Sequence, residues 1–486
     1  MKTKLLSTFA FFILSFTTTF AQSLTWGGEI AVANGSTYGK TRPRIAVTSG
    51  NIPVVMWGGG VSGEPLYAAR WNGIGFSTPV TITPPNLDPF IDTWAGADIA
   101  ASGNNVFVVF KAEPMMTGNI YVVKSSDGGV TWGAPVQADS GSGPFDDLPS
   151  IAVSDAGNPS VMFMAFDSVM GNPYYAVSTS TDGGATFPMA DTISNPGMSE
   201  VCDCCPGYMA IKGNYFVPAW RRNNSNVRDM WISISNDGGL TYTNGMDIDS
   251  TNWMLSSCPS SGPSPFLTSD SVITAFMSGA SGHNRIYINT NDYINLQAGF
   301  TAYADSAVAI SAIQNYPFLA GAEDTIALVY QQAICGNTEA MYSYSYNGAS
   351  GLVDNSFVLN NSTAGNQKNP HVAYSANTFH FVWVDFVSGN VIYKAGSTIT
   401  GIEENQNARS LSVFPNPSNE TIRIDLSELK GENGIIEVFD VNGKLVESAN
   451  VSGMKNFSIE KQIPGVYMVK VSGENNFQQI AKVVFY

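Results

Sequence analysis

Short apolar or alternating stretches recur throughout residues 22–398, and each is bounded by Gly, Asn, Asp or Ser. Stretches of this length with these boundaries predict β-strands. Seven of them end in an aromatic residue, and these aromatics follow one another at intervals of 53 to 56 residues: Trp57, Phe110, Phe166, Trp220, Phe276, Tyr330 and Trp383. The constant interval predicts seven copies of one supersecondary unit.

Each unit contains further strands. A short inner strand precedes the apolar one, as at Arg44–Val47, Ile151–Val153 and Pro370–Tyr374. After a polar loop, a strand centred on an aromatic follows: Tyr67, Tyr121, Tyr175, Trp231, Tyr287, Tyr342 and Tyr393. The last unit lacks an outer strand, and Trp26–Ile30 near the N-terminus resembles the outer strand Trp132–Val136. We therefore expect the first and last segments to pair and to close a ring.

A turn motif repeats with the same period. It reads S-x-D-x-G-x-T followed by an aromatic, in Ser125–Trp132, Ser180–Phe187 and Ser235–Tyr242. Its aspartates, Asp127, Asp182 and Asp237, are 55 residues apart, and further steps of 55 reach the degenerate copies at Asn72, Asp292 and Asn347. The aspartate can accept hydrogen bonds from backbone N–H groups of its own turn, and glycine tolerates a positive φ. The motif therefore predicts a hairpin turn.

The repeated motif resembles the Asp box, or BNR repeat, of sialidases and related β-propellers. The resemblance implies an all-β fold in which residues 22–398 form a β-propeller, and the interval predicts seven four-stranded blades. Sialidases have six blades, so a six-bladed ring is the alternative and the count departs from that family. In the family the boxes lie on the face opposite the active site. We therefore expect Asp127, Asp182 and Asp237 to be structural.

Composition narrows the class of partner. The chain of 486 residues has 23 Lys+Arg against 39 Asp+Glu, a net charge of −16, which excludes a nucleic-acid-binding protein because phosphate contacts need clustered basic residues. Only 13% of residues are charged and 47 are Gly, which is typical of an exported β protein.

At the N-terminus, Lys2 and Lys4 precede the apolar run Leu5–Phe20, which predicts a signal peptide at residues 1–21 and no transmembrane segment in the mature chain.

The C-terminal part is predicted to be a separate domain. Residues 399–409 are polar and aperiodic, as in a linker, and residues 410–486 contain short alternating strands that predict a small β-sandwich. Phe414–Pro417, Ile436–Gly443 and Ile463–Tyr467 resemble the type A C-terminal sorting domain of the type IX secretion system. The resemblance implies passage through the periplasm to the cell surface or medium, with the secretion machinery as partner. An Ig-like module that stays attached is the alternative.

The cysteines gather on one predicted face. In a propeller, the loops between blades and those joining second to third strands share a face, and all five cysteines fall in such loops: Cys202, Cys204, Cys205, Cys258 and Cys335. An oxidising compartment favours disulfides, with one thiol left over because the number is odd. The first alternative is a Cu or Zn site of three thiolates with Cys258, and with His283 nearby, and the second is a redox role.

Arginine, acidic and histidine side chains are the remaining candidate site residues. The sialidase resemblance implies a cluster of arginines that holds a carboxylate: Arg44 stands in a partial match to the family's R-I-P motif, and Arg221, Arg222 and Arg285 fall on the same face. No motif assigns the family's Tyr and Glu pair. Acidic loop residues could bind Ca²⁺ through Asp88, Asp92, Asp146, Asp147 and Asp167. The histidines, His283, His371 and His380, form no catalytic motif.

Three functions fit this organisation. The first is an exported or surface-attached propeller that binds glycans or other extracellular ligands at the cysteine-bearing face. The second is a sialidase-like exo-glycoside hydrolase, and the third is a copper- or zinc-binding propeller. A fold hosts many activities, so the choice among them depends on the site itself.

Overall fold

A computed structural model describes residues 24–61, 63–140, 144–168, 171–194, 200–295, 297–398, 409–429, 433–440, 444–460, 462–473 and 478–486. The chain divides into two compact units, Met1–Ile399 and Thr400–Tyr486, with the boundary inside the predicted linker. The predicted signal peptide and linker residues 399–408 lie outside the described residues. No helix in the described part of the chain is both long and apolar enough to span a membrane.

The described residues of the first unit form seven antiparallel sheets, which we number along the chain. Sheets 1 to 3 contain four strands each: β3 (Thr41–Thr48), β4 (Ile52–Gly58), β5 (Leu66–Arg70) and β6 (Val80–Thr81); β7 (Asp98–Ser102), β8 (Asn105–Lys111), β9 (Ile120–Ser125) and β10 (Val136–Gln137); β11 (Phe145–Val153), β12 (Pro159–Ser168), β13 (Gly171–Thr179) and β14 (Asp191–Thr192). Sheet 4 has five: β15 (Glu200–Val201), β16 (Tyr208–Lys212), β17 (Tyr215–Asn223), β18 (Met230–Ile232) and β19 (Met246–Asp247).

The remaining three sheets follow the same order. Sheets 5 and 6 contain β20 (Ser264–Leu267), β21 (Ser271–Ser278), β22 (Arg285–Asp292) and β23 (Gln297–Tyr303); β24 (Ile313–Ala322), β25 (Thr325–Ile334), β26 (Asn337–Ser345) and β27 (Ser356–Val358). Sheet 7 combines β28 (Gln367–Ser375), β29 (Thr378–Asp385) and β30 (Asn390–Thr398) with the N-terminal β1 (Leu24–Trp26) and β2 (Ile30–Ala33). Two short helical turns, α1 (Gly35–Tyr38) and η1 (Gly348–Leu352), lie in loops.

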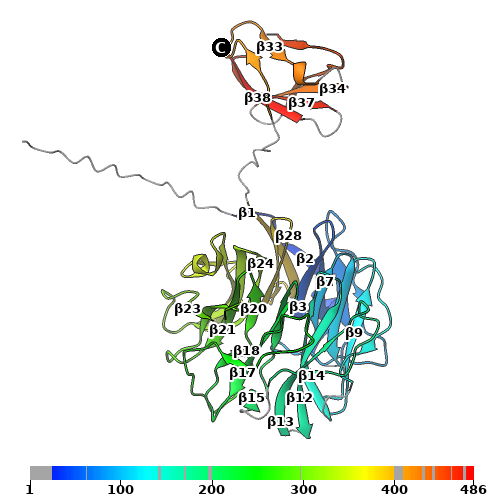
Figure 1. The fold of residues 1–486 in the computed structure, drawn as a ribbon, viewed down its shortest axis with the longest axis vertical. Helices are drawn as coiled ribbons and strands as arrows, with labels where there is room; N and C mark the ends of the chain where they lie inside the picture. The colour runs from blue at the N-terminus through cyan, green and yellow to red at the C-terminus, as the bar shows by residue number, and fades with distance from the viewer. Residues whose placement is uncertain are drawn as a thin grey trace, which may run out of the picture. The chain divides into compact units, whose positions relative to one another are not determined.

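The seven sheets form a closed ring. The inner strand of each sheet contacts the inner strand of the next, and β28 returns to β3, so that sheets adjacent in sequence are adjacent in space (Figure 1). Closure comes from the N-terminus: Trp26 pairs with Gly396 and Ile30 with Tyr393, both on β30. The number of sheets in the described residues equals the number of blades expected from the interval of the aromatics. The N-terminal segment pairs with the last unit as predicted, but the single strand expected at Trp26–Ile30 is divided into β1 and β2, and Gly27–Glu29 belong to neither.

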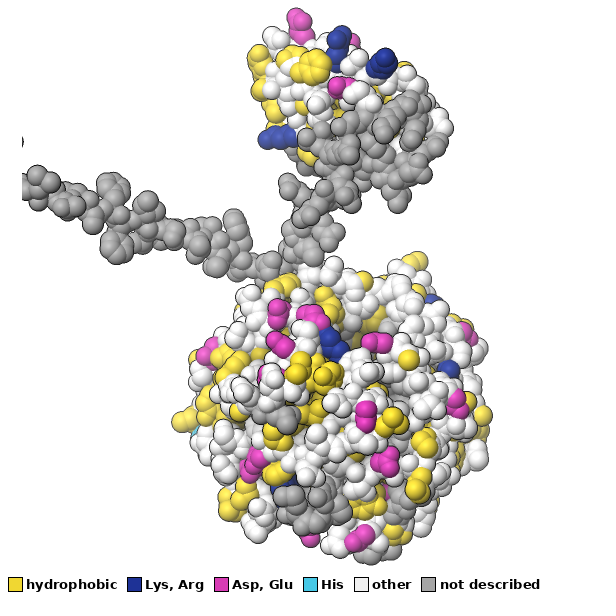
Figure 2. Space-filling view, in the orientation of Figure 1, with side chains coloured by type: hydrophobic (Ala, Val, Ile, Leu, Met, Phe, Trp, Pro, Cys, Tyr) yellow, Lys and Arg dark blue, Asp and Glu magenta, His cyan; other side chains and the backbone are white. Residues whose placement is uncertain are grey.

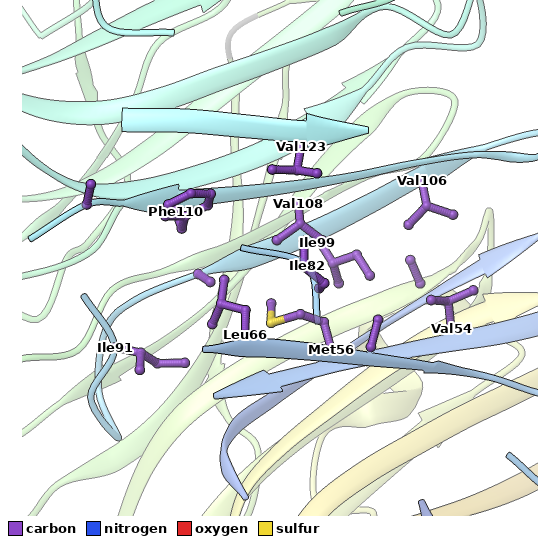
Figure 3. Packing of buried hydrophobic residues seen from close by; sticks show 14 residues of the cluster. Val54, Met56, Leu66, Ile82, Ile91, Ile99, Val106, Val108, Phe110 and Val123 are labelled. Atoms are coloured by element: carbon purple, nitrogen blue, oxygen red, sulfur yellow. The ribbon is translucent and has the colours of Figure 1, made fainter. Parts of the chain in front are cut away.

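The core lies between neighbouring sheets. Val54, Met56 and Leu66 of sheet 1 face Val108 and other residues of sheet 2, and all of these side chains are buried (Figure 3). The repeated aromatics lie in the C-terminal half of the second strands, before the strand ends, and are at most 3% exposed: Trp57, Phe110, Phe166, Trp220, Phe276, Tyr330 and Trp383. A second strand that is buried on both faces is apolar over most of its length, which is why these strands can be recognised in the sequence.

The three predicted boxes have one common geometry. In the first, Asp127 Oδ1 accepts hydrogen bonds from the backbone N–H groups of Val130 (3.1 Å) and Thr131 (2.9 Å), and Oδ2 accepts from Thr131 Oγ1 at 2.6 Å. Asp182 and Asp237 make the same bonds in their own turns. These bonds stabilise the ionised form and hold the pKa of Asp127 down to about 2. The boxes join third to fourth strands, so they lie at the end of the sheets opposite to the loops between blades.

The second unit is a small β-sandwich. One sheet contains β31 (Arg409–Ser410), β38 (Gln478–Phe485), β37 (Gly465–Gly473), β34 (Gly434–Asp440) and β35 (Leu445–Asn450); the other contains β32 (Val413–Phe414), β33 (Ile422–Asp425) and β36 (Asn456–Ile459); a short turn, η2 (Ser427–Leu429), follows β33. Ile422, Ile436, Val438 and Val469 are buried between the sheets.

Candidate functional site

A proline recurs near the start of the inner strands. Six of the seven inner strands have it: Pro43, Pro149, Pro206, Pro263, Pro317 and Pro370. In four cases the preceding residue has a positive φ and the strand pairing shifts there: Arg42 (48°), Leu148 (51°), Tyr316 (55°) and Asn369 (53°). Proline suits such a bulge because it has no N–H to donate. Non-glycine residues held at positive φ cost about 1–3 kcal/mol each and cluster at functional sites.

The segments around these prolines contribute to a pocket at the mouth of the central channel. Residues from six of the seven sheets, or from the loops that lead into them, line it: Arg44, Thr93, Trp94, Pro206, Tyr208, Gly262, Tyr316, Pro317, Phe318, Asn369, Pro370 and His371. The cavity encloses about 30 Å³, which is room for a water molecule or two. A small polar group can therefore enter the cavity, while anything larger must rest on its rim.

Two arginines and one aspartate set the charge at the mouth. Arg42 donates hydrogen bonds through Nη1 to the Ala97 carbonyl and through Nη2 to Tyr208 Oη, the latter at 2.9 Å. Arg44 donates to the Pro43 carbonyl, and its Nε lies 3.9 Å from Asp98 Oδ1. Burial, and next the charge of Arg42, lowers the pKa of Arg44 to about 10, so it remains charged at neutral pH. Burial raises the pKa of Asp98.

His371 is neutral at the same mouth. Its Nδ1 accepts a hydrogen bond from the Ile45 N–H at 3.3 Å, which leaves the proton on Nε2. Burial and the nearby arginines hold its pKa well below the usual range. The ring packs on Phe318 with centroids 3.8 Å apart. Arg42 Nε, Arg44 Nε and His371 Nε2 are buried and have no hydrogen-bond partner among the described residues, so three N–H donors are unsatisfied here.

The other candidate arginines lie elsewhere and bind backbone carbonyls. Arg221 donates to the carbonyls of Ser261 (3.1 Å), Arg228 (2.7 Å) and Met277. Arg285 donates to the carbonyls of Asn284, Ala309, Ile310 and Ala312. The Arg222 guanidinium lies 4.1 Å from the centroid of the Trp231 ring. Of the predicted arginines, Arg44 alone is among the residues that line the pocket.

Four cysteines are joined in two disulfides beside the pocket. Cys202 pairs with Cys205 and Cys204 with Cys258, with Cα–Cα distances of 5.5 and 6.3 Å that suit disulfides. The second bridge ties the loop entering sheet 4 to the loop entering sheet 5. Cys335, in the β25–β26 turn, is free and exposed. A metal would need these sulfurs as thiolates, which the disulfides do not provide.

The remaining candidates do not assemble into a further site. Asp88, on a loop, and Asp167, near the end of β12, are exposed and lie in different segments, whereas Asp147 is buried and its pKa is raised to about 6 by that burial. Asp92 accepts a hydrogen bond from the Thr93 N–H. Within the described ranges, Cys202, Cys204 and Cys205 are the only group of three whose ligand atoms lie within 4.8 Å of one another. Asp146 is buried.

The two remaining histidines are also separate from the mouth. His380 bridges Tyr393 Oη (2.8 Å) and Asn51 Oδ1 (2.9 Å) inside sheet 7, and burial lowers its pKa to about 4. His283 is exposed in the turn before β22. Neither residue lines the pocket.

A carboxyl group whose ionised form is destabilised, that of Asp229, lies outside the mouth, in sheet 4. Burial, and then repulsion from Asp247 and Asp249, raises the pKa of Asp229 to about 7. A folded-state pKa above the unfolded value means that the folded chain gains a proton, so stability falls as pH rises from about 4 through 7. Asp229→Asn keeps the shape and removes the charge. We expect it to raise Tm by about 2 °C or more at pH 8 and to change it little at pH 4.

Thermal melts of wild type and variant across this pH range check the prediction. Asp88→Asn, on an exposed loop, is the matched control and should shift neither end of the profile. An Asp229→Asn variant that is less stable than wild type at pH 8 would contradict the assignment.

Several mouth residues have no counterpart among the predicted candidates. Arg42, Asp98, Tyr208 and Tyr316 come from four different sheets and meet only because the ring closes. A signal was present in the prolines, because Pro149, Pro206, Pro263, Pro317 and Pro370 recur with the period of the blades. Of the residues that precede these prolines, Gly262, Tyr316 and Asn369 line the pocket.

Comparison with known proteins identifies the C-terminal unit. Residues 412–486 match the family described as a secretion system C-terminal sorting domain. The chain is therefore cargo of the type IX secretion system, exported to the cell surface or the medium, and the secretion machinery is its partner in export. No curated protein matches the chain.

Solved structures similar to this chain include glycan-active enzymes. A protein of unknown function from Dyadobacter fermentans is 11% identical, with 77% of this chain and 99% of that chain covered and a TM-score of 0.44. A polysaccharide lyase, an ulvan lyase of family PL25, is 10% identical (76% and 94% covered, TM-score 0.49). Trypanosoma rangeli sialidase is 10% identical (91% and 84% covered, TM-score 0.42). At such identities, similarity concerns the fold and not the chemistry.

Proposed function

We propose that this exported propeller binds an acidic glycan at the mouth of its central channel. The observation that carries the proposal is the convergence of aromatic rings and unsatisfied N–H donors from several sheets on one pocket. Trp94, Tyr208 and Tyr316 offer flat apolar surfaces with polar edges, against which a sugar ring can pack. Arg44 Nε and His371 Nε2 supply donors for its oxygen atoms.

Charge supports an acidic ligand over a neutral one. Two guanidinium groups, Arg42 and Arg44, lie at the mouth together with the buried carboxyl group of Asp98, while His371 is uncharged; Asp92, beside the lining residue Thr93, is a second carboxyl group near the rim. The two guanidinium groups stand out in a chain of net charge −16. On the propeller face in Figure 2, basic side chains are few and isolated. An oxygen atom of a carboxylate or sulfate group is small enough to enter the cavity and can accept from the free donors.

Binding is better supported than hydrolysis. Glycoside hydrolases generally place two carboxyl groups on either side of the scissile bond. None of the residues that line the pocket is Asp or Glu, and Asp98 is held near Arg44 behind them. Arg221 and Arg285 are engaged with carbonyls, so they do not complete a carboxylate clamp with Arg44.

Calorimetric titration with matched acidic and neutral oligosaccharides tests the proposal. We expect polyuronate or sulfated oligomers to bind and the neutral oligomers to bind at least about tenfold more weakly. Tyr316→Asn removes a rim ring yet tolerates the positive φ of that position, and it should lower the affinity about tenfold or more.

Phe357→Ala, an exposed ring on the outer strand β27, is the control and should leave affinity unchanged. The proposal fails if no acidic oligomer binds. It also fails if the two variants lose affinity to the same extent.

A further inference from the structure

The two disulfides beside the mouth share one cluster of sulfur atoms. Cys202 Sγ, in one bridge, lies 3.7 Å from Cys204 Sγ, in the other. The sulfurs of Cys202, Cys204 and Cys205 all lie within 4.8 Å of one another. A thiolate formed at Cys204 would therefore be in contact with the neighbouring disulfide without any large movement of the backbone.

The two bridges differ in their exposure. Cys258 is exposed and Cys204 is half-buried, whereas Cys202 and Cys205 are both 0% exposed. A thiol in solution can therefore reach the Cys204–Cys258 bridge but not the Cys202–Cys205 bridge. Access is one of the conditions that control thiol–disulfide exchange.

We propose that this cluster is a thiol–disulfide exchange site that accepts a dithiol from outside and passes the exchange to the buried bridge. One thiolate of the dithiol attacks Cys258 Sγ and forms a mixed disulfide, and Cys204 leaves as a thiolate. The second thiol of the dithiol then resolves the mixed disulfide, which releases the Cys258 thiol and an oxidised dithiol. The dithiol is thus oxidised and the Cys204–Cys258 bridge is reduced.

The second step is internal and consumes no further reductant. The Cys204 thiolate attacks Cys202 Sγ, the Cys202–Cys205 bond breaks, a Cys202–Cys204 bond forms, and Cys205 leaves as a thiolate that takes up a proton. One disulfide is present before this step and one after it. The buried Cys205 becomes a thiol although no external reagent can reach it.

The exchange acts on the wall of the mouth. The Cys205 carbonyl accepts a hydrogen bond from Tyr175 Oη, and the next residue, Pro206, lines the pocket. Gly262, four residues after Cys258, lines it too. Opening the bridges frees the two loops that carry these residues. The exchange itself does not depend on which ligand the mouth binds.

A variant with a permanently free Cys204 tests the internal step. Cys258→Ser, in a Cys335→Ser background that removes the exposed thiol, leaves Cys204 unpaired. The folded protein is incubated without reductant, quenched in acid, denatured and labelled with a maleimide at mildly acidic pH, where exchange is slow. Peptide mapping should find at least about a tenth of the label on Cys205 and the rest on Cys204. Label on Cys204 alone would overturn the proposal.

Cys204→Ser in the same background is the matched control. It leaves Cys258 unpaired on the other loop, and we expect label on Cys258 alone. Melting curves establish that each variant is folded.

Graded reduction of wild type gives a second measurement, compared with a double variant whose melting curve establishes that it is folded. In wild type, a low concentration of dithiothreitol should label Cys205 at least about tenfold faster than in a Cys204→Ser/Cys258→Ser double variant, whose remaining bridge is buried. Equal rates in the two proteins would overturn the proposal. If the mouth binds no glycan, these labelling patterns are still expected, so the two proposals fail separately.

Discussion

Deletion of Leu24–Ala33 is expected to lower the Tm of the propeller by roughly 10–20 °C, because these residues close the ring. The two short strands in this segment supply the outer edge of sheet 7 by pairing with β30. Leu24 and Val32 are 6% and 4% exposed, and Trp26 packs against Tyr342 and Phe381 with centroids 5.1 and 5.5 Å apart. Losing this burial costs about 5 kcal/mol or more.

Because the sheets form a closed ring, loss of these strands is expected to destabilise more than sheet 7. Without the closing strands, β30 has an unpaired edge, and the interface between sheets 7 and 1 loses Ile30 and Val32. Each sheet is stabilised by its two neighbours, so opening one interface weakens the whole repeat. A broadened transition at lower temperature, measured by calorimetry, is the expected result.

Removal of residues 410–486 is the matched control for this deletion. The C-terminal sandwich has its own core and forms a separate compact unit. Its removal should leave the Tm of the propeller unchanged. If removal of Leu24–Ala33 also left that Tm unchanged, the N-terminal segment would not close the ring.

The sheets could be predicted from the sequence because their buried strands are apolar and recur at a nearly constant interval. The second strands lie between two neighbouring sheets and are apolar over most of their length, and Trp57 and Trp383 lie near the ends of such strands. Strand register is harder to predict from the sequence. Trp57 lies directly opposite Tyr67, but Tyr175 lies opposite Met164 and not opposite Phe166. The length of the hairpin between second and third strands changes from blade to blade, and hairpin length sets the register.

The mouth is harder to predict because its residues are distant in sequence. Arg42 meets Tyr208, which is 166 positions away, and His371 meets the backbone of Ile45 across the closure of the ring. Which arginine lines the pocket depends on the bulge in each inner strand. The motif found Arg44, while Arg221 and Arg285 turn to nearby carbonyls. Four cysteines allow three pairings, and only the positions of the loops decide among them.

Arg44→Met is expected to lower affinity for an acidic oligosaccharide by at least about a hundredfold and for a neutral one by about tenfold or less. The Arg44 side chain lines the pocket, and its buried Nε makes no hydrogen bond although Asp98 Oδ1 lies 3.9 Å away, so its charge acts on a ligand anion with little screening by water. Arg44→Lys should restore only part of the affinity, because lysine lacks the planar fork that matches a carboxylate. His371 is neutral, so its titration should contribute no change in the affinity of wild type between pH 6 and 8.

The control for Arg44→Met is Arg70→Ala, since Arg70 belongs to the same sheet but lies at its other end, where Val54 pairs with it. This control should change neither affinity, and melting curves identify any variant that is unfolded. Isothermal titration with the acidic and neutral oligomers separates the two roles that Arg44 could have. If it only supported the wall of the pocket, both ligands would lose affinity equally. A selective loss for the acidic ligand requires that the guanidinium faces the anion.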